Sequence, residues 1–115
     1  MMRGKIYVLV PMIEITKDNF ESEVKKSNVP VVIDAWAAWC GPCRVFSPVF
    51  EGLEKDFASK VKFAKMNVDE NPEISGEYNI MSIPTALLFE KGSVKAMSVG
   101  ALPKEDFRKW LEKSL

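Results

Sequence analysis

The chain has 115 residues, of which 47% are hydrophobic and 28% charged, the composition of a soluble globular domain rather than of a disordered chain. Its 16 Lys and Arg residues balance its 16 Asp and Glu residues, so the basic excess typical of nucleic-acid binding is missing and we expect no nucleic-acid partner. The chain has no histidine, which excludes the Cys–His and Ser–His pairs of many hydrolases.

The first residues are basic and then apolar up to Ile13, like the beginning of a signal peptide. Pro11 interrupts this stretch, and no small-residue cleavage site follows it. We therefore expect residues 1–11 to be an N-terminal extension, either an added strand or a loose arm, in front of a domain of residues 12–115. A translation start at Met12 is the alternative.

The segment from Ile13 to Ile15 predicts a short strand, and Thr16 suits the N-cap of a helix from Lys17 to about Ser27. Val31 to Trp36 is apolar on both alternating faces and is interrupted only by Asp34. Such a run predicts a central strand that is covered on both sides.

A helix follows directly and keeps helical apolar spacing as far as Phe57. A strand from Val61 to Val68 comes next, and then a short helix with Asn71 as its cap and Pro72 in its first position. Two strands, from Thr85 to Glu90 and from Val94 to Val99, are joined by a turn at Lys91-Gly92-Ser93. The last predicted helix begins at Pro103. The order βαβαβαββα predicts an α/β fold, with a central mixed sheet flanked on both faces by four helices.

Both cysteines lie in Trp39-Cys40-Gly41-Pro42-Cys43, between the predicted central strand and its helix. This context favours a dithiol redox site, because one thiolate can attack a substrate disulfide and the second thiol can resolve the mixed disulfide. A structural disulfide is the first alternative, but a loop of about four residues gains only roughly 2 kcal/mol. A structural zinc site is the second, but it usually needs four Cys or His ligands.

With Asp34, Trp36, this motif, Pro48, Ile83-Pro84-Thr85, Gly92 and Gly100, the chain resembles the thioredoxin family over nearly its whole length beyond Pro11. The resemblance implies strand order 1-3-2-4-5, with the last two strands antiparallel, and a cis peptide before Pro84 facing the cysteines. Three positions depart from the family pattern: Ala35 replaces an aromatic residue, Ser82 replaces Arg or Gly, and Arg44 replaces Lys.

The motif places Cys40 at a helix N-terminus, where free N–H groups and the helix dipole favour a thiolate, so we expect it to be the nucleophile with a lowered pKa. Cys43 lies one turn further and is expected to be the less exposed, resolving thiol. Burial should raise the pKa of Asp34. By resemblance, Asp34 exchanges the Cys43 proton through water, with Lys65 close by. The alternatives are a structural buried acid and a solvated lysine.

The resemblance also implies a docking surface for protein substrates, formed by Trp39, Gly41, Pro42, Ile83, Pro84, Gly100 and Ala101. Trp36 is expected to pack in the core against the motif, and Gly92 to be a turn glycine.

The resemblance implies a cytoplasmic, monomeric thiol-disulfide oxidoreductase that reduces protein disulfides through Cys40 and Cys43. No nucleotide, flavin or metal motif is present, so we expect no cofactor, no metal and no membrane partner. The electrons must then come from another protein, by resemblance a thioredoxin reductase of the NADPH-flavin or ferredoxin type. Two alternatives stay open. An oxidase or isomerase typically has His between the cysteines, where this chain has Gly41-Pro42, and a redox-regulated binding module would not turn over.

Overall fold

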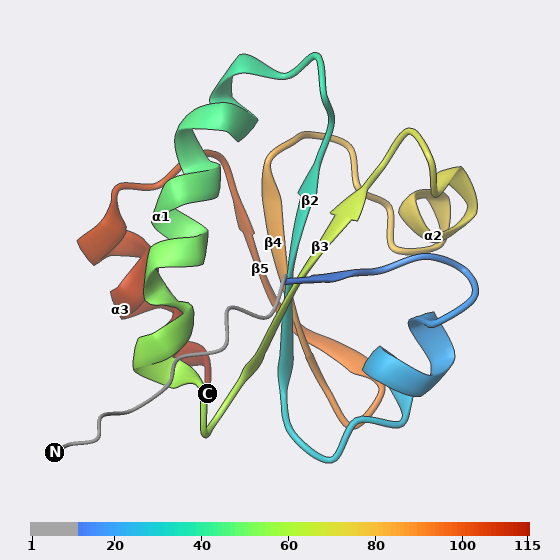
Figure 1. Ribbon diagram of the computed structural model, residues 1–115, viewed down its shortest axis with the longest axis horizontal. Coiled ribbons are helices and arrows are strands. Elements are labelled where there is room, and N and C mark those ends of the chain that lie inside the picture. The colour runs from blue at the N-terminus through green and yellow to red at the C-terminus, as the bar shows by residue number, and fades with distance from the viewer. Residues whose placement is uncertain (1–11) are drawn as a thin grey trace, which may run out of the picture.

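The computed structural model describes residues 12–115, and the predictions for residues 1–11 lie outside this part of the chain. The described residues form a mixed sheet in the order β1-β3-β2-β4-β5 (Figure 1). β3 is parallel to β1 and β2, whereas β4 is antiparallel to β2 and β5. The strands are β1 (Ile13–Glu14), β2 (Val31–Trp36), β3 (Lys62–Asn67), β4 (Thr85–Glu90) and β5 (Ser93–Val99). The predicted strand order is confirmed.

Four helical segments cover the sheet: the π-helical turn η1 (Glu21–Lys25) and the helices α1 (Gly41–Phe57), α2 (Pro72–Glu77) and α3 (Lys104–Ser114). α1 and α3 lie on one face, while η1 and α2 lie on the other (Figure 1). The predicted α/β class with helices on both faces is therefore confirmed. None of the helices in residues 12–115 is long and apolar enough to cross a membrane.

The first helix is shorter than the sequence predicts. The structure has a π-helical turn over Glu21–Lys25 instead of a helix from Lys17 to Ser27. Its defining hydrogen bond runs from the N–H of Lys26 to the carbonyl of Glu21, at 2.9 Å. The Asn19 side chain accepts from the N–H of Thr16 and donates to the carbonyl of Glu14. The N–H of Asp18 donates to the Thr16 Oγ1, and the N–H of Phe20 donates to the Thr16 carbonyl at 2.9 Å, so Thr16 caps this turn as predicted.

Asn71 occupies the predicted N-cap position of α2, but its side chain does not cap the helix. Its amide instead donates to the carbonyls of Ile15, at 3.3 Å, and Asn67, at 2.9 Å. Asn71 therefore ties the segments that follow β1 and β3 together. Pro72 opens the helix as predicted.

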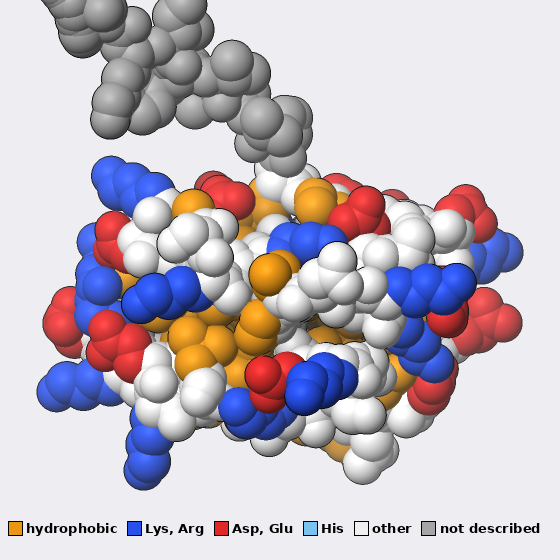
Figure 2. All heavy atoms as spheres, turned by 90° about the horizontal axis from the view of Figure 1, so that it is seen from below, with side chains coloured by type: hydrophobic (Ala, Val, Ile, Leu, Met, Phe, Trp, Pro, Cys, Tyr) orange, Lys and Arg blue, Asp and Glu red, His pale blue; other side chains and the backbone are white. Residues whose placement is uncertain are grey.

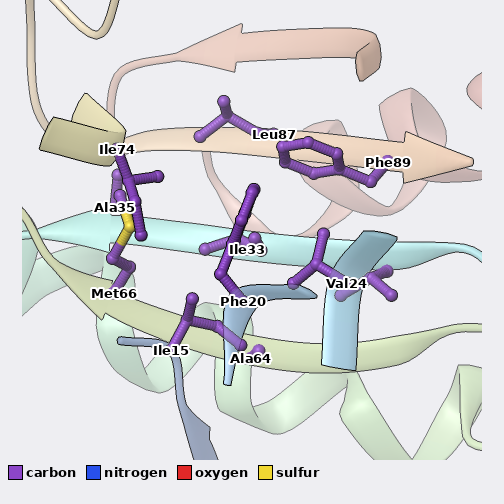
Figure 3. Packing of buried hydrophobic residues seen from close by; sticks show 11 residues of the cluster. Ile15, Phe20, Val24, Ile33, Ala35, Ala64, Met66, Ile74, Leu87 and Phe89 are labelled. Atoms are coloured by element: carbon purple, nitrogen blue, oxygen red, sulfur yellow. The ribbon is translucent and has the colours of Figure 1, made fainter. Parts of the chain in front are cut away.

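The core has two halves, one on each face of the sheet. The face under η1 and α2 is mainly aliphatic, with Phe20, Val24, Ile33 and Leu87 packed together (Figure 3). Ala35, the departure from the family pattern, lies in this half, and its β3 neighbour Met66 and the α2 residue Ile74 belong to the same cluster. Ala35 is thus fully buried among larger side chains, with none of its surface exposed.

The other half of the core, under α1 and α3, is rich in phenylalanine. The ring of Phe50 lies 4.9 Å from that of Phe63, 5.9 Å from that of Phe107 and 6.0 Å from that of Phe46, centroid to centroid. Aromatic rings in such tilted arrangements add to the stabilisation from burial. The helix that begins at the cysteine motif is thus fixed to the sheet by large buried side chains.

The hairpin between β4 and β5 requires glycine at its second turn position. Lys91 and Gly92 both have positive φ, 54° and 84°. A Cβ at Gly92 would lie 3.2 Å from the carbonyl oxygen of Lys25, so both conformation and space favour glycine. Gly92 is a turn glycine, as predicted. The end of the molecule opposite the β2–α1 loop carries acidic and basic side chains intermingled, in keeping with the zero net charge (Figure 2).

Candidate active site

The two cysteines meet at the junction of β2 and α1. They are joined as a disulfide, with 5.3 Å between their Cα atoms. Cys40 is the N-cap of α1 in an extended conformation, and its Sγ accepts a hydrogen bond from the N–H of Cys43 at 3.2 Å. Pro42 lies in the first turn, where the lack of an N–H costs little. The chain therefore places one sulfur on the end of the helix and the other one turn inside it.

The helix N-terminus, and not exposure, distinguishes the two sulfurs. The exposed fractions are 4% for Cys40 and 3% for Cys43, too similar to decide the order of attack. By contrast, the Cys40 Sγ receives a backbone N–H, and the first turn of α1 has no acidic residue that would oppose a thiolate. This arrangement favours negative charge on Cys40 in the reduced form.

The segment before β4 lies next to the Cys40 sulfur. The Ile83–Pro84 peptide is cis, as the resemblance implied. The carbonyl oxygen of Ile83 lies 3.9 Å from the Cys40 Sγ. The N–H of Gly100 donates to the carbonyl of Pro84 at 2.8 Å, and Gly100 has a φ of 102°, which favours glycine. Ile83, Pro84 and Gly100 are thus brought beside the sulfurs.

An apolar surface borders the disulfide. Trp39 is 69% exposed, and its Nε1 donates to Asp69 at 2.8 Å, which fixes the orientation of the ring. Gly41, Pro42 and Ala101 are exposed as well. A shallow groove of about 150 Å³ runs between Trp39 and Ile83, and Met81, which the sequence analysis missed, lies on it with 83% of its surface exposed. An apolar side chain two positions before Ile83 was the available signal.

Arg44, another departure from the family pattern, contacts the loop before the motif. Its Nη2 donates to the carbonyl of Ala38 at 2.8 Å. Trp36 packs against the cluster of Ala37, Cys40 and Cys43, as predicted.

Asp34 lies in the middle of β2 with no exposed surface. Neither of its carboxyl oxygens has a hydrogen-bond partner among residues 12–115. Desolvation raises the pKa of Asp34 from its usual 3.8 to about 7; the charge of Lys65 opposes this shift, and those of Glu51 and Glu14 add to it. The predicted rise is confirmed in direction.

Lys65 is the β3 neighbour of Asp34 in the parallel register, as predicted, but its ammonium group is bound elsewhere. The Lys65 Nζ donates to the Ser47 Oγ and to the Glu51 Oε2, the latter at 2.9 Å. The sequence analysis missed both partners. Their signal is the four-residue spacing of Cys43, Ser47 and Glu51, which puts all three on one side of α1.

No group of three His, Cys, Asp or Glu side chains in residues 12–115 is placed to hold a metal ion. The described site offers two sulfurs, a buried carboxyl group, and a lysine on the neighbouring strand that is bound to α1.

Comparisons with known proteins identify the family. The thioredoxin family model matches residues 11–113. Thioredoxin from Rickettsia bellii (strain RML369-C) is 48% identical over 101 residues, which cover 88% of this chain and 96% of that protein. Thioredoxin 1 from Nostoc sp. (strain PCC 7120) is 44% identical over 102 residues, 89% of this chain and 95% of that protein. Thioredoxin from Chlorobaculum thiosulfatiphilum is 46% identical over 102 residues, 89% of this chain and 94% of that protein. The chain therefore belongs to the thioredoxin family and is a thiol-disulfide oxidoreductase, a protein-disulfide reductase with Cys40 and Cys43 as its exchanging pair.

Proposed function

We propose that Cys40 is the nucleophile and Cys43 the resolving thiol. The Cys40 thiolate attacks one sulfur of a substrate disulfide, a mixed disulfide forms, and the first substrate thiolate leaves and takes up a proton. Cys43 then loses its proton and attacks the Cys40 sulfur. This step breaks the mixed disulfide, forms the Cys40–Cys43 disulfide and releases the second substrate sulfur as a thiolate, which takes up a proton from the solvent. The observation that carries the proposal is the position of the Cys40 Sγ on the N-terminus of α1.

In the same proposal, Asp34 accepts the proton that Cys43 loses, and Lys65 tunes the charge of Asp34. The side chain of Asp34 alternates with Ile33 along β2 and shares the face of Val32, which packs in the cluster of Phe46 and Phe50 under α1. α1 also carries Cys43, so donor and acceptor belong to the same side of the sheet. A pKa of about 7 suits a group that must take up and release a proton near neutral pH.

The docking surface for protein substrates is proposed to be the exposed apolar rim of the disulfide. It comprises Trp39, Gly41, Pro42, Ile83, Pro84, Gly100 and Ala101, and we add Met81. The exposure of Trp39 and Met81 beside a shallow groove supports this assignment. Exposed apolar patches on a soluble domain commonly mark contact sites for other proteins.

Re-reduction of the Cys40–Cys43 disulfide is assigned to a thioredoxin reductase of the NADPH-flavin or ferredoxin type, and the protein is proposed to act as a cytoplasmic monomer. The chain offers no nucleotide or flavin motif of its own. Turnover of a protein disulfide with each reductase type, supplied with NADPH or reduced ferredoxin, identifies the donor.

Trapping the mixed disulfide tests the order of attack. Cys43→Ser should accumulate an adduct with a disulfide-bonded protein through Cys40, because no second thiol is present to resolve it. Cys40→Ser is the matched control, and we expect no appreciable adduct with it. Mass spectrometry of both variants locates the linkage. An adduct on Cys43 in the control would overturn the assignment of roles.

A further inference from the structure

Lys65 is opposite Asp34 in the sheet, but its ammonium group donates to two side chains of α1 and not to the Asp34 carboxyl group. We propose that Ser47 and Glu51 are positioning residues that hold the Lys65 ammonium group away from the Asp34 carboxyl group, and so keep Asp34 able to accept the Cys43 proton. The inference rests on the proposed role of Asp34 as a proton acceptor.

The three groups form a closed set of hydrogen bonds. The Lys65 Nζ donates to the Ser47 Oγ and, at 2.9 Å, to the Glu51 Oε2, while the Ser47 Oγ donates to the same Glu51 oxygen at 3.0 Å. The Nζ also lies 5.8 Å from the centroid of the Trp36 ring, within range of a cation–π interaction. Lys65 is only 14% exposed, so it is held in this direction by fixed partners rather than solvated.

Asp34 and Lys65 are nevertheless close enough in the fold to pair. They are opposite each other in the parallel register of β2 and β3. The side chains of Lys65, Ser47 and Cys43 line a common cleft of about 200 Å³, so the lysine has space beside the helix. A lysine released from α1 would have two carboxyl groups opposite it in the register of the sheet, Glu14 on β1 and the buried, unpaired Asp34 on β2.

Three charged groups act on Asp34 from the elements packed around it: Lys65 from β3, Glu51 from α1 and Glu14 from β1. On β4, its register neighbour is the uncharged Ala86. Removing Glu51 takes away a negative charge and frees Lys65, and both changes favour the ionised carboxylate. Removing the Ser47 hydroxyl changes no charge and takes away one of the two groups that hold Lys65. The pKa of Asp34 should therefore fall in both variants.

The test measures the titration of Asp34 directly, by the NMR shift of its carboxyl carbon in the disulfide form. In Ser47→Ala and Glu51→Gln we expect a midpoint lower by about one pH unit, the lower end of the effect of an opposite charge brought within a few ångström. Glu54→Gln is the matched control, since it removes the same charge from the same helix. An unchanged midpoint in the first two variants, or an equal shift in the control, would overturn the proposal.

A second background shows whether Ser47 acts through the lysine. Lys65→Met should raise the midpoint, and Ser47→Ala added to it should cause no further change. A further fall without the lysine would contradict the proposal. The rate of release from a Cys40-linked mixed disulfide, measured against pH, separates this inference from the proposed function. If the Asp34 midpoint moves and the rate profile does not, then Ser47 and Glu51 position Lys65, but Asp34 is not the proton acceptor.

Discussion

The two faces of β2 carry neighbouring side chains of opposite character. Ile33 points into the aliphatic half of the core under η1 and α2, where every buried neighbour in the cluster is hydrophobic. Asp34 is on the face under α1 and α3, the side of the phenylalanine-rich cluster, and has no hydrogen-bond partner among the described residues. Burial of Ile33 on one face of β2 therefore stabilises the fold, whereas burial of the ionised Asp34 on the other face destabilises it. The face with Asp34 is the one covered by α1, the helix that carries Cys43.

The largest expected effect is that of removing the charge of Asp34. A rise in pKa from 3.8 to about 7 corresponds to about 4 kcal/mol of lost stability when Asp34 is fully ionised. The folded state binds the proton more tightly than the unfolded state, so this loss is absent below about pH 4, grows as the pH rises, and is complete above about pH 7. Asp34→Asn should therefore be more stable than the parent at pH 8, by about 2 kcal/mol after the cost of its own buried amide.

Denaturant unfolding of the disulfide forms at pH 4 and pH 8 measures this difference. Ile33→Val is the control on the other face, where deleting one methylene should cost about 1 kcal/mol at both pH values. An Asp34→Asn variant whose gain is the same at pH 4 and pH 8 would show that Asp34 does not titrate between them. It would then be equivalent to any other buried polar group.

The smallest expected effect concerns residues 1–11, which we propose to be an extension of the thioredoxin domain. A chain that begins at Met12 should keep full disulfide reductase activity and lose little stability, because the thioredoxin family model begins to match at residue 11. Activity and unfolding of the two forms are compared side by side. A loss of several kcal/mol would instead indicate that Ile6, Val8 and Val10 form an added strand with a buried face.

The sequence predicted the elements whose structure depends mainly on their own residues. The apolar run of Val31 to Trp36 predicted β2, and the strand order followed once the family resemblance was recognised. The first helix was predicted only in part: Thr16 caps the first turn as predicted, but the bonding widens to a π-helical pattern over Glu21–Lys25, which the residue pattern does not predict. Asn71 was wrong as a side-chain cap, since its amide reaches Ile15, which is distant in the sequence.

At the candidate site, the local sequence pattern predicted the buried carboxyl group of Asp34 but not the hydrogen-bond partners of Lys65. Asp34 stands out because it interrupts an apolar strand. The bonds of Lys65 to Ser47 and Glu51 depend on the packing of α1 against β3, which links residues 18 and 14 positions apart. Helical spacing places Ser47 and Glu51 on one side of α1, but it does not say which strand that side faces.

We propose, above all, a role for Asp34 on the α1-facing side of β2 as the proton acceptor for Cys43. Its most direct test is the single-turnover release of substrate from a mixed disulfide on Cys40, measured against pH for the parent and for Asp34→Asn. The parent rate should rise with a midpoint near the Asp34 pKa of about 7, and the variant should be slower and lack that midpoint. Identical profiles for the two proteins would contradict the claim and leave Asp34 as a structural residue.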